Sequence, residues 1–373
     1  MTNRKKWVIV LVIVLALGMT AAGCSKNSDG SGSSKTAESG GSATEGGTTA
    51  GKTDSNATTK SGDSTTGGST TGGNMKWTAV DVTSILGDSI ITAIAYGGGK
   101  FVAGASSSAD GNMAYSSDGV TWTAVTESPF VITNATHGMV YANGKFVVVG
   151  DVGIIAYSTN GTDWTRVNTG TIFEYTSSGA THKAAVTAIA YGGGKFVVGS
   201  RNGKMAYSTD GVTWTAVDIS NITNDTLRSI AYGNGTFVGT WGYNGKIMTS
   251  KDGITWTAIA NSPFGSSYVE VAYGGNKFVG GNYKGTIAYS TDGVTWTTVS
   301  NSTFGESIIN VIAYANGKFV AGGSVGKMAY SSDGVTWTTV TNSTFRESID
   351  AIAYGNGTFV AGGKGGRMAY SKD

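Results

Sequence analysis

Short apolar segments separated by turn residues run from Met75 to the end of the chain. One unit begins with an apolar run at Ser307–Tyr314, and shorter segments follow at Lys318–Gly323, Lys327–Ser332 and Thr336–Val340. An Asn-Gly pair, the strongest short hairpin signal, separates the first two segments. The segments have strand lengths, and none shows the sustained 3.6-residue apolar period of an amphipathic helix. The unit therefore predicts four antiparallel β-strands, the most apolar of which is innermost.

This unit recurs along the whole patterned region. Its first segment ends in a tyrosine that marks the repeat: Tyr96, Tyr141, Tyr191, Tyr232, Tyr273, Tyr314 and Tyr354. Successive marker tyrosines are separated by 45, 50, 41, 41, 41 and 40 residues. A period of about 40–45 residues is the length of a four-stranded propeller blade. We therefore predict an all-β fold over residues 75–373, a seven-bladed β-propeller of four-stranded antiparallel blades.

A heptapeptide with the pattern Ser-x-Asp/Asn-Gly-x-x-Trp lies between the third and fourth strands of the unit. Its third and seventh residues are Asp118 and Trp122, Asn160 and Trp164, Asp210 and Trp214, Asp252 and Trp256, Asp292 and Trp296, and Asp333 and Trp337. Asp and Ser side chains hydrogen-bond to backbone groups of tight turns, and Gly adopts positive φ without strain. The tryptophan is then expected to pack between neighbouring sheets. We therefore predict a structural role for every copy of this motif.

The two ends of the chain supply the two halves of a seventh copy. The chain stops after Ser371-Lys372-Asp373, and the patterned region starts with Asn74-Met75-Lys76-Trp77. Joined, the two ends place Asp373 and Trp77 in register with the complete copies. This arrangement predicts that the N-terminal segment forms the outer strand of the last blade, which closes the ring without an open sheet edge.

The heptapeptide resembles the Asp-box, or BNR repeat, of bacterial sialidases and related propellers, although that motif usually has one more residue between Asp and Trp. The chain is also similar to non-catalytic bacterial Asp-box propellers, including lipid-anchored photosystem assembly factors. This resemblance covers residues 75–373 and implies a non-catalytic binding or scaffold module for a protein or a glycan. The alternative that it leaves open is a sialidase-like, glycan-active hydrolase.

A sialidase-like activity would need an arginine triad for the substrate carboxylate, a Tyr–Glu nucleophile pair and an acid Asp. The arginines of the patterned region are Arg166, Arg201, Arg228, Arg346 and Arg367. All except Arg166 are expected on or near one rim, so a triad stays open. The Phe/Tyr-Arg-Ile-Pro segment of sialidases is absent from the sequence. We therefore expect a protein that is not an enzyme and that uses no cofactor.

Residues 1–23 have the organisation of a signal peptide. The basic segment Arg4-Lys5-Lys6 precedes an apolar run of 11 residues, which is short for a membrane span. The segment Ala21-Ala22-Gly23-Cys24 resembles the bacterial lipoprotein cleavage box, except that Ala21 replaces the usual Leu. The resemblance implies that Cys24, the single cysteine, is lipidated and holds the protein at the extracytoplasmic face of the bacterial cell envelope. An ordinary secretory signal and an uncleaved membrane anchor are the alternatives.

Residues 24–74 are expected to be a disordered tether. After Cys24 this segment contains no aromatic residue and no Leu, Ile, Val or Met, so it cannot bury enough apolar surface to offset the entropy of ordering. Residues 1–74 hold seven of the 26 Lys and Arg and five of the 24 Asp and Glu, which leaves 19 of each in residues 75–373. This balance argues against a nucleic-acid partner. We expect a monomer bound to the membrane by its lipid, with an unidentified protein or glycan partner.

Positions at which the repeats differ are the candidates for a binding site. On the loops between second and third strands, Arg201, Trp241, Tyr243 and Tyr283 depart from the pattern. Exposed aromatic residues on a rim suit stacking on sugars or anchoring of a protein partner. The alternative is that these three aromatic side chains pack on one another and on the loop below.

Two further sets of positions also vary. The longest connection between units, Asn168–Ala185, carries Phe173, Tyr175 and His182 and is either a functional loop or a tolerated insertion. The residues four positions before the marker tyrosines are Thr92, His137, Thr187, Arg228, Val269, Asn310 and Asp350. They are expected near one mouth of the axial channel, as a ligand site or as solvated lining. The two histidines, His137 and His182, lack zinc-site spacing, so no metal is expected.

Overall fold

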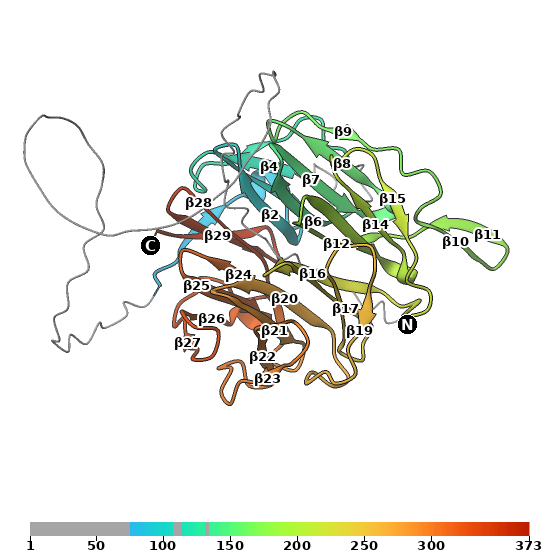
Figure 1. The fold of residues 1–373 in the computed structure, drawn as a ribbon. Coiled ribbons are helices and arrows are strands. Elements are labelled where there is room, and N and C mark those ends of the chain that lie inside the picture. Colours follow the sequence, from blue (N-terminus) through green and yellow to red (C-terminus); the bar gives the residue numbers. More distant parts are fainter. Residues whose placement is uncertain (1–74, 107–112, 131–133, 373) are drawn as a thin grey trace, which may run out of the picture. The chain divides into compact units, whose positions relative to one another are not determined.

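The chain folds into seven four-stranded antiparallel sheets that are arranged in a ring (Figure 1). The computed structural model describes residues 75–106, 113–130 and 134–372. The predicted signal peptide of residues 1–23, the predicted tether of residues 24–74 with Cys24, and Asp373 lie outside the described residues. The prediction of an all-β, seven-bladed propeller is confirmed.

Six of the blades are built from four consecutive strands, with the innermost strand first. Their strands are β2 (Ile91–Gly97), β3 (Lys100–Ala105), β4 (Met113–Ser116) and β5 (Thr123–Ala124) in blade 1; β6 (Thr136–Ala142), β7 (Lys145–Gly150), β8 (Ile155–Ser158) and β9 (Thr165–Arg166) in blade 2; β12 (Val186–Gly192), β13 (Lys195–Ser200), β14 (Met205–Ser208) and β15 (Thr215–Val217) in blade 3; β16 (Leu227–Gly233), β17 (Thr236–Trp241), β18 (Lys246–Ser250) and β19 (Thr257–Ala258) in blade 4; β20 (Val269–Gly274), β21 (Lys277–Asn282), β22 (Ile287–Ser290) and β23 (Thr297–Thr298) in blade 5; and β24 (Ile309–Ala315), β25 (Lys318–Gly323), β26 (Met328–Ser331) and β27 (Thr338–Thr339) in blade 6. Blade 7 takes β28 (Ile349–Gly355), β29 (Thr358–Gly363) and β30 (Arg367–Lys372) from the end of the chain and β1 (Thr78–Asp81) from the start.

The innermost strands are buried because each one packs between its two neighbours around the ring. In β24, every residue except the half-buried Tyr314 is buried. Neighbouring inner strands contact one another in the order β2, β6, β12, β16, β20, β24 and β28, and β28 contacts β2 again. The apolar runs of the sequence therefore form a hydrophobic core that continues from blade to blade.

Strand β1 completes the seventh blade by pairing with β30. The antiparallel register joins Thr78 to Tyr370 and Asp81 to Arg367, and Trp77, just before the strand, is 4% exposed. The outer edge of β30 is therefore covered, as the fourth strand covers the third in the other blades. The prediction that the N-terminal segment closes the ring is confirmed.

The heptapeptide turns are held by side-chain hydrogen bonds that recur from blade to blade. In blade 4, Oδ1 of Asp252 accepts bonds from the backbone N–H groups of Ile254 at 2.8 Å and Thr255 at 2.7 Å. The Ser250 hydroxyl donates to the same oxygen at 2.9 Å and accepts from the Gly253 N–H at 2.9 Å. The backbone bond from Thr255 is the main reason why the pKa of Asp252 falls to about 2. The turn therefore satisfies its own backbone donors with an ionised carboxylate.

The glycine of each heptapeptide also lies against the preceding blade. Gly253 has a φ of 74°, and a Cβ atom there would lie 2.8 Å from Cγ2 of Val197 in blade 3. The Trp256 indole N–H donates to the Gly253 carbonyl at 3.3 Å, and its side chain is buried. A side chain at this glycine would push two sheets apart. The turn therefore connects two strands of its own blade and also packs against the preceding blade.

Few elements of the described residues lie outside the blades. A short helix, α1 (Thr83–Leu86), and the 3-10 turns η1 (Asp151–Gly153), η2 (Arg201–Gly203) and η3 (Ser324–Gly326) lie in loops, and the sequence pattern predicted none of them. The connection from blade 2 to blade 3 forms a hairpin of β10 (Glu174–Ser177) and β11 (Ala180–Lys183). In the described ranges, no helix has the length and apolar character needed to cross a membrane.

Removal of residues 75–80 is expected to open the ring, because β30 loses its partner and Trp77 leaves the core. The truncated protein should melt at a lower temperature and aggregate through the exposed edge of β30. Circular dichroism during heating, with light scattering, measures both effects. The variant Trp77→Ala should lower the free energy of unfolding by about 3–5 kcal/mol while keeping the strand. Unchanged melting in both proteins would contradict the proposed closure.

Candidate functional site on the loop rim

The variable loops gather at one end of the ring, which we call the loop rim. Because the strands of a blade are antiparallel, the loops from second to third strands and the connections between blades lie at the same end. The heptapeptide turns lie at the other end, which we call the turn rim. The first kind of loop carries Arg201, Tyr243 and Tyr283, and a connection between blades carries Tyr175 and His182. The structure therefore places these candidates on one side of the ring.

In six blades the innermost strand carries a β-bulge near its start. The pairing register shifts at one residue, and the bulged residues are Thr92, His137, Thr187, Arg228, Asn310 and Asp350. A bulge turns a side chain out of the normal strand alternation. Here the bulges turn polar side chains onto neighbouring blades: Thr92 Oγ1 donates to the Thr136 carbonyl at 2.9 Å, and Thr187 donates to the Leu227 carbonyl. All six residues are buried, so the expectation of a solvated lining is wrong for them.

Blade 5 lacks this bulge and carries a buried acidic residue instead. In β20, pairing runs without a shift from Val269 with Asn282 to Glu270 with Gly281. Asn282 holds the adjoining loop, since its Oδ1 accepts two backbone N–H bonds there. Glu270 is 0% exposed and lies against Arg228 of blade 4. The sequence reasoning missed Glu270, whose one signal is a charge within an apolar strand.

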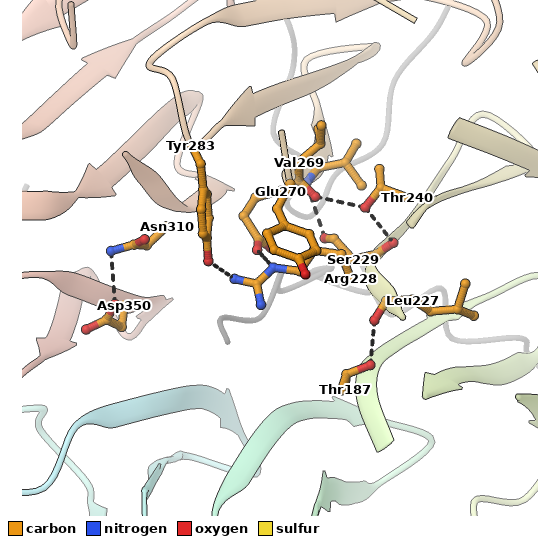
Figure 2. A network of polar contacts seen from close by, with 12 residues as sticks. Thr187, Leu227, Arg228, Ser229, Thr240, Val269, Glu270, Tyr283, Asn310 and Asp350 are labelled. Carbon is orange, nitrogen blue, oxygen red and sulfur yellow. Dashed lines mark hydrogen bonds and ion pairs between the residues drawn. The ribbon is translucent and has the colours of Figure 1, made fainter. Parts of the chain in front are cut away.

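Arg228 is the centre of a buried polar cluster between blades 4 and 5 (Figure 2). Its Nε lies 2.8 Å from Oε1 of Glu270, and a terminal N–H donates to the Tyr283 hydroxyl. The guanidinium carbon lies 5.2 Å from the ring centroid of Tyr283 and 5.4 Å from that of Tyr268. Burial raises the pKa of Glu270 to about 8, although Arg228 opposes the rise. Burial also raises the pKa of Tyr283 to about 12, so this phenol keeps its proton at neutral pH.

Asp350 belongs to a second buried group, between blades 6 and 7 (Figure 2). Asn310 Nδ2 donates to Oδ1 of Asp350 at 3.0 Å, and the Ser348 hydroxyl donates to Oδ2 at 2.6 Å. Burial raises the pKa of Asp350 to about 7, against the effects of the Ser348 bond and the Arg228 charge. Asp350 and Arg228 are therefore parts of the packing between blades, and neither is open to a ligand from solvent.

The rim tyrosines form a stack that runs from the surface to Arg228. The ring of Tyr243 lies 5.2 Å from that of Tyr268, edge to face, and Tyr268 lies 5.5 Å from Tyr283 in the same arrangement. Tyr243 is 56% exposed, whereas Tyr283 is half-buried. The sequence reasoning missed Tyr268, which lies in a connection between blades.

Trp241 departs from its expected role as a rim aromatic residue. It is the last residue of β17, pairs with Leu227, and is 6% exposed within the core between blades 3 and 4. Because it still belongs to the strand, its side chain follows the alternation into the core. Phe173 needs the same correction, because it is 1% exposed and packs in the core of blades 2 and 3.

A cleft of about 290 Å³ opens on the loop rim between blades 2 and 3. Its lining includes Asp151 and Val152 of η1, Tyr175 of β10, Lys183 of β11 and Arg201 of η2. The side chains of Lys183 and Arg201 make no hydrogen bond or ion pair with another described residue. The cleft therefore presents two cationic groups beside an aromatic ring. Sequence reasoning identified Tyr175 and Arg201 but missed Asp151, Val152 and Lys183.

His137 holds the carboxylate of this cleft in place. Its Nε2 lies 2.7 Å from Oδ1 of Asp151, and the Ala135 N–H donates to Oδ2 at 3.0 Å. Burial raises the pKa of Asp151, but the bond and charge of His137 and the charge of Arg201 outweigh it, so the pKa is lowered. Asp151 therefore stays ionised with both oxygens engaged. His182 is exposed on the hairpin, with its ring 5.5 Å from that of Tyr175.

The geometry offers little for sialidase-like chemistry. Arg166 on β9 donates to a backbone carbonyl, and Arg228 is buried against Glu270. The Tyr283 hydroxyl accepts a bond from Arg228, and its raised pKa disfavours a nucleophilic phenolate. Among the described residues, no three His, Cys, Asp or Glu side chains are placed to share a metal ion.

Comparison with solved structures defines the class of protein as a seven-bladed β-propeller. YCF48 bound to D1 peptide is similar with a TM-score of 0.61 and 15% identity, over 80% of this chain and 95% of that chain. Virginiamycin B lyase from Staphylococcus aureus is similar with a TM-score of 0.62 and 12% identity, over 80% and 99%. The extracellular domain of a hybrid two-component system from B. thetaiotaomicron reaches 0.61 and 10%, over 80% and 43%. No family model and no curated protein matches the sequence.

The buried Asp350 carboxyl should make the protein less stable as the pH rises from about 4 to 7. Its pKa is near 3.9 in an unfolded chain and about 7 in the folded protein. The folded state therefore binds more protons in this range, and the free energy of unfolding falls with rising pH. Asp350→Asn keeps the shape and removes the titration, so urea unfolding across this range should show a shallower slope. Glu270, raised to about 8, keeps a falling slope in the variant, whereas turn carboxylates such as Asp252, lowered to about 2, act in the opposite sense near pH 4. An identical slope in both proteins would contradict the assignment.

Proposed function

We propose that the protein is a non-catalytic binding module whose loop rim takes an acidic segment of a protein partner. The observation that carries this proposal is the cleft of Lys183 and Arg201, two cationic side chains without a hydrogen bond or ion pair to another described residue. The carboxylate in the lining, Asp151, is already engaged by His137 and a backbone N–H. An incoming carboxylate would meet an arginine fork, which binds it through two parallel N–H bonds.

A strained valine at the edge of the cleft supports an interface there. Val152 has a φ of 50° and is 49% exposed. A β-branched residue rarely adopts this left-handed conformation, which costs about 1–2 kcal/mol. At the equivalent position of η2 the chain has Asn202, with a φ of 63°, a residue type that tolerates the conformation. An exposed valine contributes little burial to the isolated fold, whereas it offers a partner an apolar contact beside the two cations.

The combination of charges and apolar groups favours a peptide over the alternative of a glycan hydrolase. Two cations, the Tyr175 ring and the Val152 side chain suit an acidic residue flanked by an apolar one. A hydrolase would need a nucleophile within reach, and Tyr283 holds its proton against Arg228. A solved propeller of the same fold carries a peptide, which is compatible with this choice.

We also infer that the chain is an Asp-box propeller held at a membrane by an N-terminal lipid. The recurring Asp and Ser hydrogen bonds of the heptapeptide turns support the first inference. The segment Ala21-Ala22-Gly23-Cys24 supports the second. A Gly- and Ser-rich coil of the length of residues 24–74 would span about 40 Å. The loop rim would then meet its partner at the extracytoplasmic face, away from the bilayer surface.

Peptides selected from a random display library on the purified protein should be enriched in Asp and Glu. The double variant Lys183→Gln, Arg201→Gln should lose this enrichment and keep its melting temperature, because neither side chain makes a hydrogen bond or ion pair with another described residue. Lys195→Gln, Lys277→Gln, at the starts of β13 and β21 on the turn rim, is the control that removes the same number of positive charges. Sequencing of the selected pools measures the enrichment. Pools without acidic enrichment, or enrichment that survives in the double variant, would overturn the proposal.

The variants Val152→Asn and Val325→Asn separate strain from binding. Val325 has a φ of 52° and is 68% exposed, but it lies on blade 6, outside the cleft lining. Both substitutions relieve the same strain and should raise the free energy of unfolding by about 0.5–1 kcal/mol. Only Val152→Asn should weaken binding of the selected peptides in fluorescence polarisation. Equal binding by both variants would remove Val152 from the interface.

A further inference from the structure

We infer a second site on the loop rim, at Tyr243 between blades 4 and 5, that binds a neutral sugar. Tyr243 is the most exposed aromatic side chain of the described residues, at 56%. It lies in the loop between β17 and β18, two residues after the buried Trp241. Tyr243 does not line the cleft between blades 2 and 3. The evidence for this second site is therefore independent of the evidence for the cleft.

The exposed ring of Tyr243 is supported by a second ring beneath the surface. Tyr243 contacts Tyr268 edge to face, and Tyr268 contacts Tyr283 in the same way. The stack ends at the guanidinium of Arg228, whose Nε lies 2.8 Å from Oε1 of the buried Glu270 (Figure 2). Tyrosine has only two rotatable side-chain bonds, and the contact with Tyr268 limits the orientations of the Tyr243 ring. A ligand that packs on this ring therefore costs little additional side-chain entropy.

Two planar polar side chains with unused hydrogen-bonding capacity lie over Gly242, the residue before Tyr243. A Cβ atom built on Gly242 would lie 2.6 Å from Oδ2 of Asp225 and 3.0 Å from Oδ1 of Asn244, so both oxygens converge over this glycine. Oδ1 of Asp225 accepts the Thr226 N–H at 2.6 Å. Within the described ranges, Oδ2 of Asp225 and the Asn244 amide have no hydrogen-bond partner. Both side chains are exposed.

This combination matches the chemistry of a pyranose ring. One face of such a ring presents C–H groups that pack on an aromatic face, and its edge presents hydroxyl groups that donate to a carboxylate and exchange bonds with an amide. The Asp225 carboxylate repels anions, so the site selects neutral sugars over acidic ones. An apolar protein anchor fits less well, because the residues around Tyr243 are polar: Asn244, Lys246 and Asp225 are all exposed.

Saturation-transfer difference NMR on the purified full-length protein tests the site. The probes are methyl glycosides of mannose, galactose and glucose, each at about 10 mM, a concentration suited to a Kd near 1 mM. N-acetylneuraminic acid is the acidic comparator. At least one neutral glycoside should show transfer to the C–H groups of one face, and the acidic sugar should show less.

Substitutions then assign the signal to residues. Tyr243→Ala should weaken binding at least tenfold, Tyr243→Phe should retain it, and Asp225→Asn should weaken it and reduce the preference for neutral sugars. Val325→Asn, at the equivalent loop of blade 6, should leave the signal unchanged. Peptide selection on Tyr243→Ala should proceed as on the parent protein, which keeps this inference separate from the acidic-peptide cleft. Absence of transfer from every neutral glycoside, or transfer that Tyr243→Ala leaves unchanged, would overturn the sugar site.

Discussion

Each sheet of the ring is buried by its neighbours, and in blades 1 to 6 the turn glycine lies against a valine of the preceding blade. Gly253 and Val197 make this contact between blades 4 and 3, and Gly119 with Val360 makes it between blades 1 and 7. A blade that lacked its outer strand would lose packing contacts with both neighbouring blades. The pairing of β1 with β30 therefore matters to the whole ring, because it completes the one blade that the end of the chain leaves short.

The features that sequence reasoning identified are those that a few neighbouring residues encode. The turn of Ser250 to Trp256 contains its own glycine, its own carboxylate and its own tryptophan. Each copy of the turn can therefore be recognised from its own seven residues. The polar cluster between blades is different. Phe264 precedes Tyr273 in blade 5 by nine residues, and Phe345 precedes Tyr354 in blade 7 by nine. Of these two blades, blade 7 has the bulge and blade 5 does not. The spacing from the phenylalanine to the tyrosine is therefore the same in both blades, and it does not explain why only one of the two strands has a bulge.

The missing bulge follows from contacts that are distant along the sequence. In blade 5, Ser267 Oγ accepts the Tyr283 N–H at 3.0 Å, and Asn282 Nδ2 donates to the Phe264 carbonyl at 3.0 Å. These bonds hold the start of β20 in a continuous register, and Glu270 then meets Arg228. The cost of desolvating the Glu270 carboxylate exceeds the attraction of Arg228, so the pKa of Glu270 is raised to about 8. The two tyrosine rings against Arg228 add cation–π attraction.

The same arrangement explains why variation gathers on the loop rim. A change in a heptapeptide turn alters contacts in two blades, because its glycine lies against the neighbouring sheet. A change at Val152 or Tyr243 alters groups that face solvent, so the ring tolerates it. The two sites draw on different pairs of blades, blades 2 and 3 for the cationic cleft and blades 4 and 5 for the tyrosine stack. The two sets of residues are distinct, although the charge of Arg201 in the cleft also acts on Tyr268 of the stack. Near-identical repeats can therefore carry two chemistries on one rim, each built from side chains that the repeat does not fix.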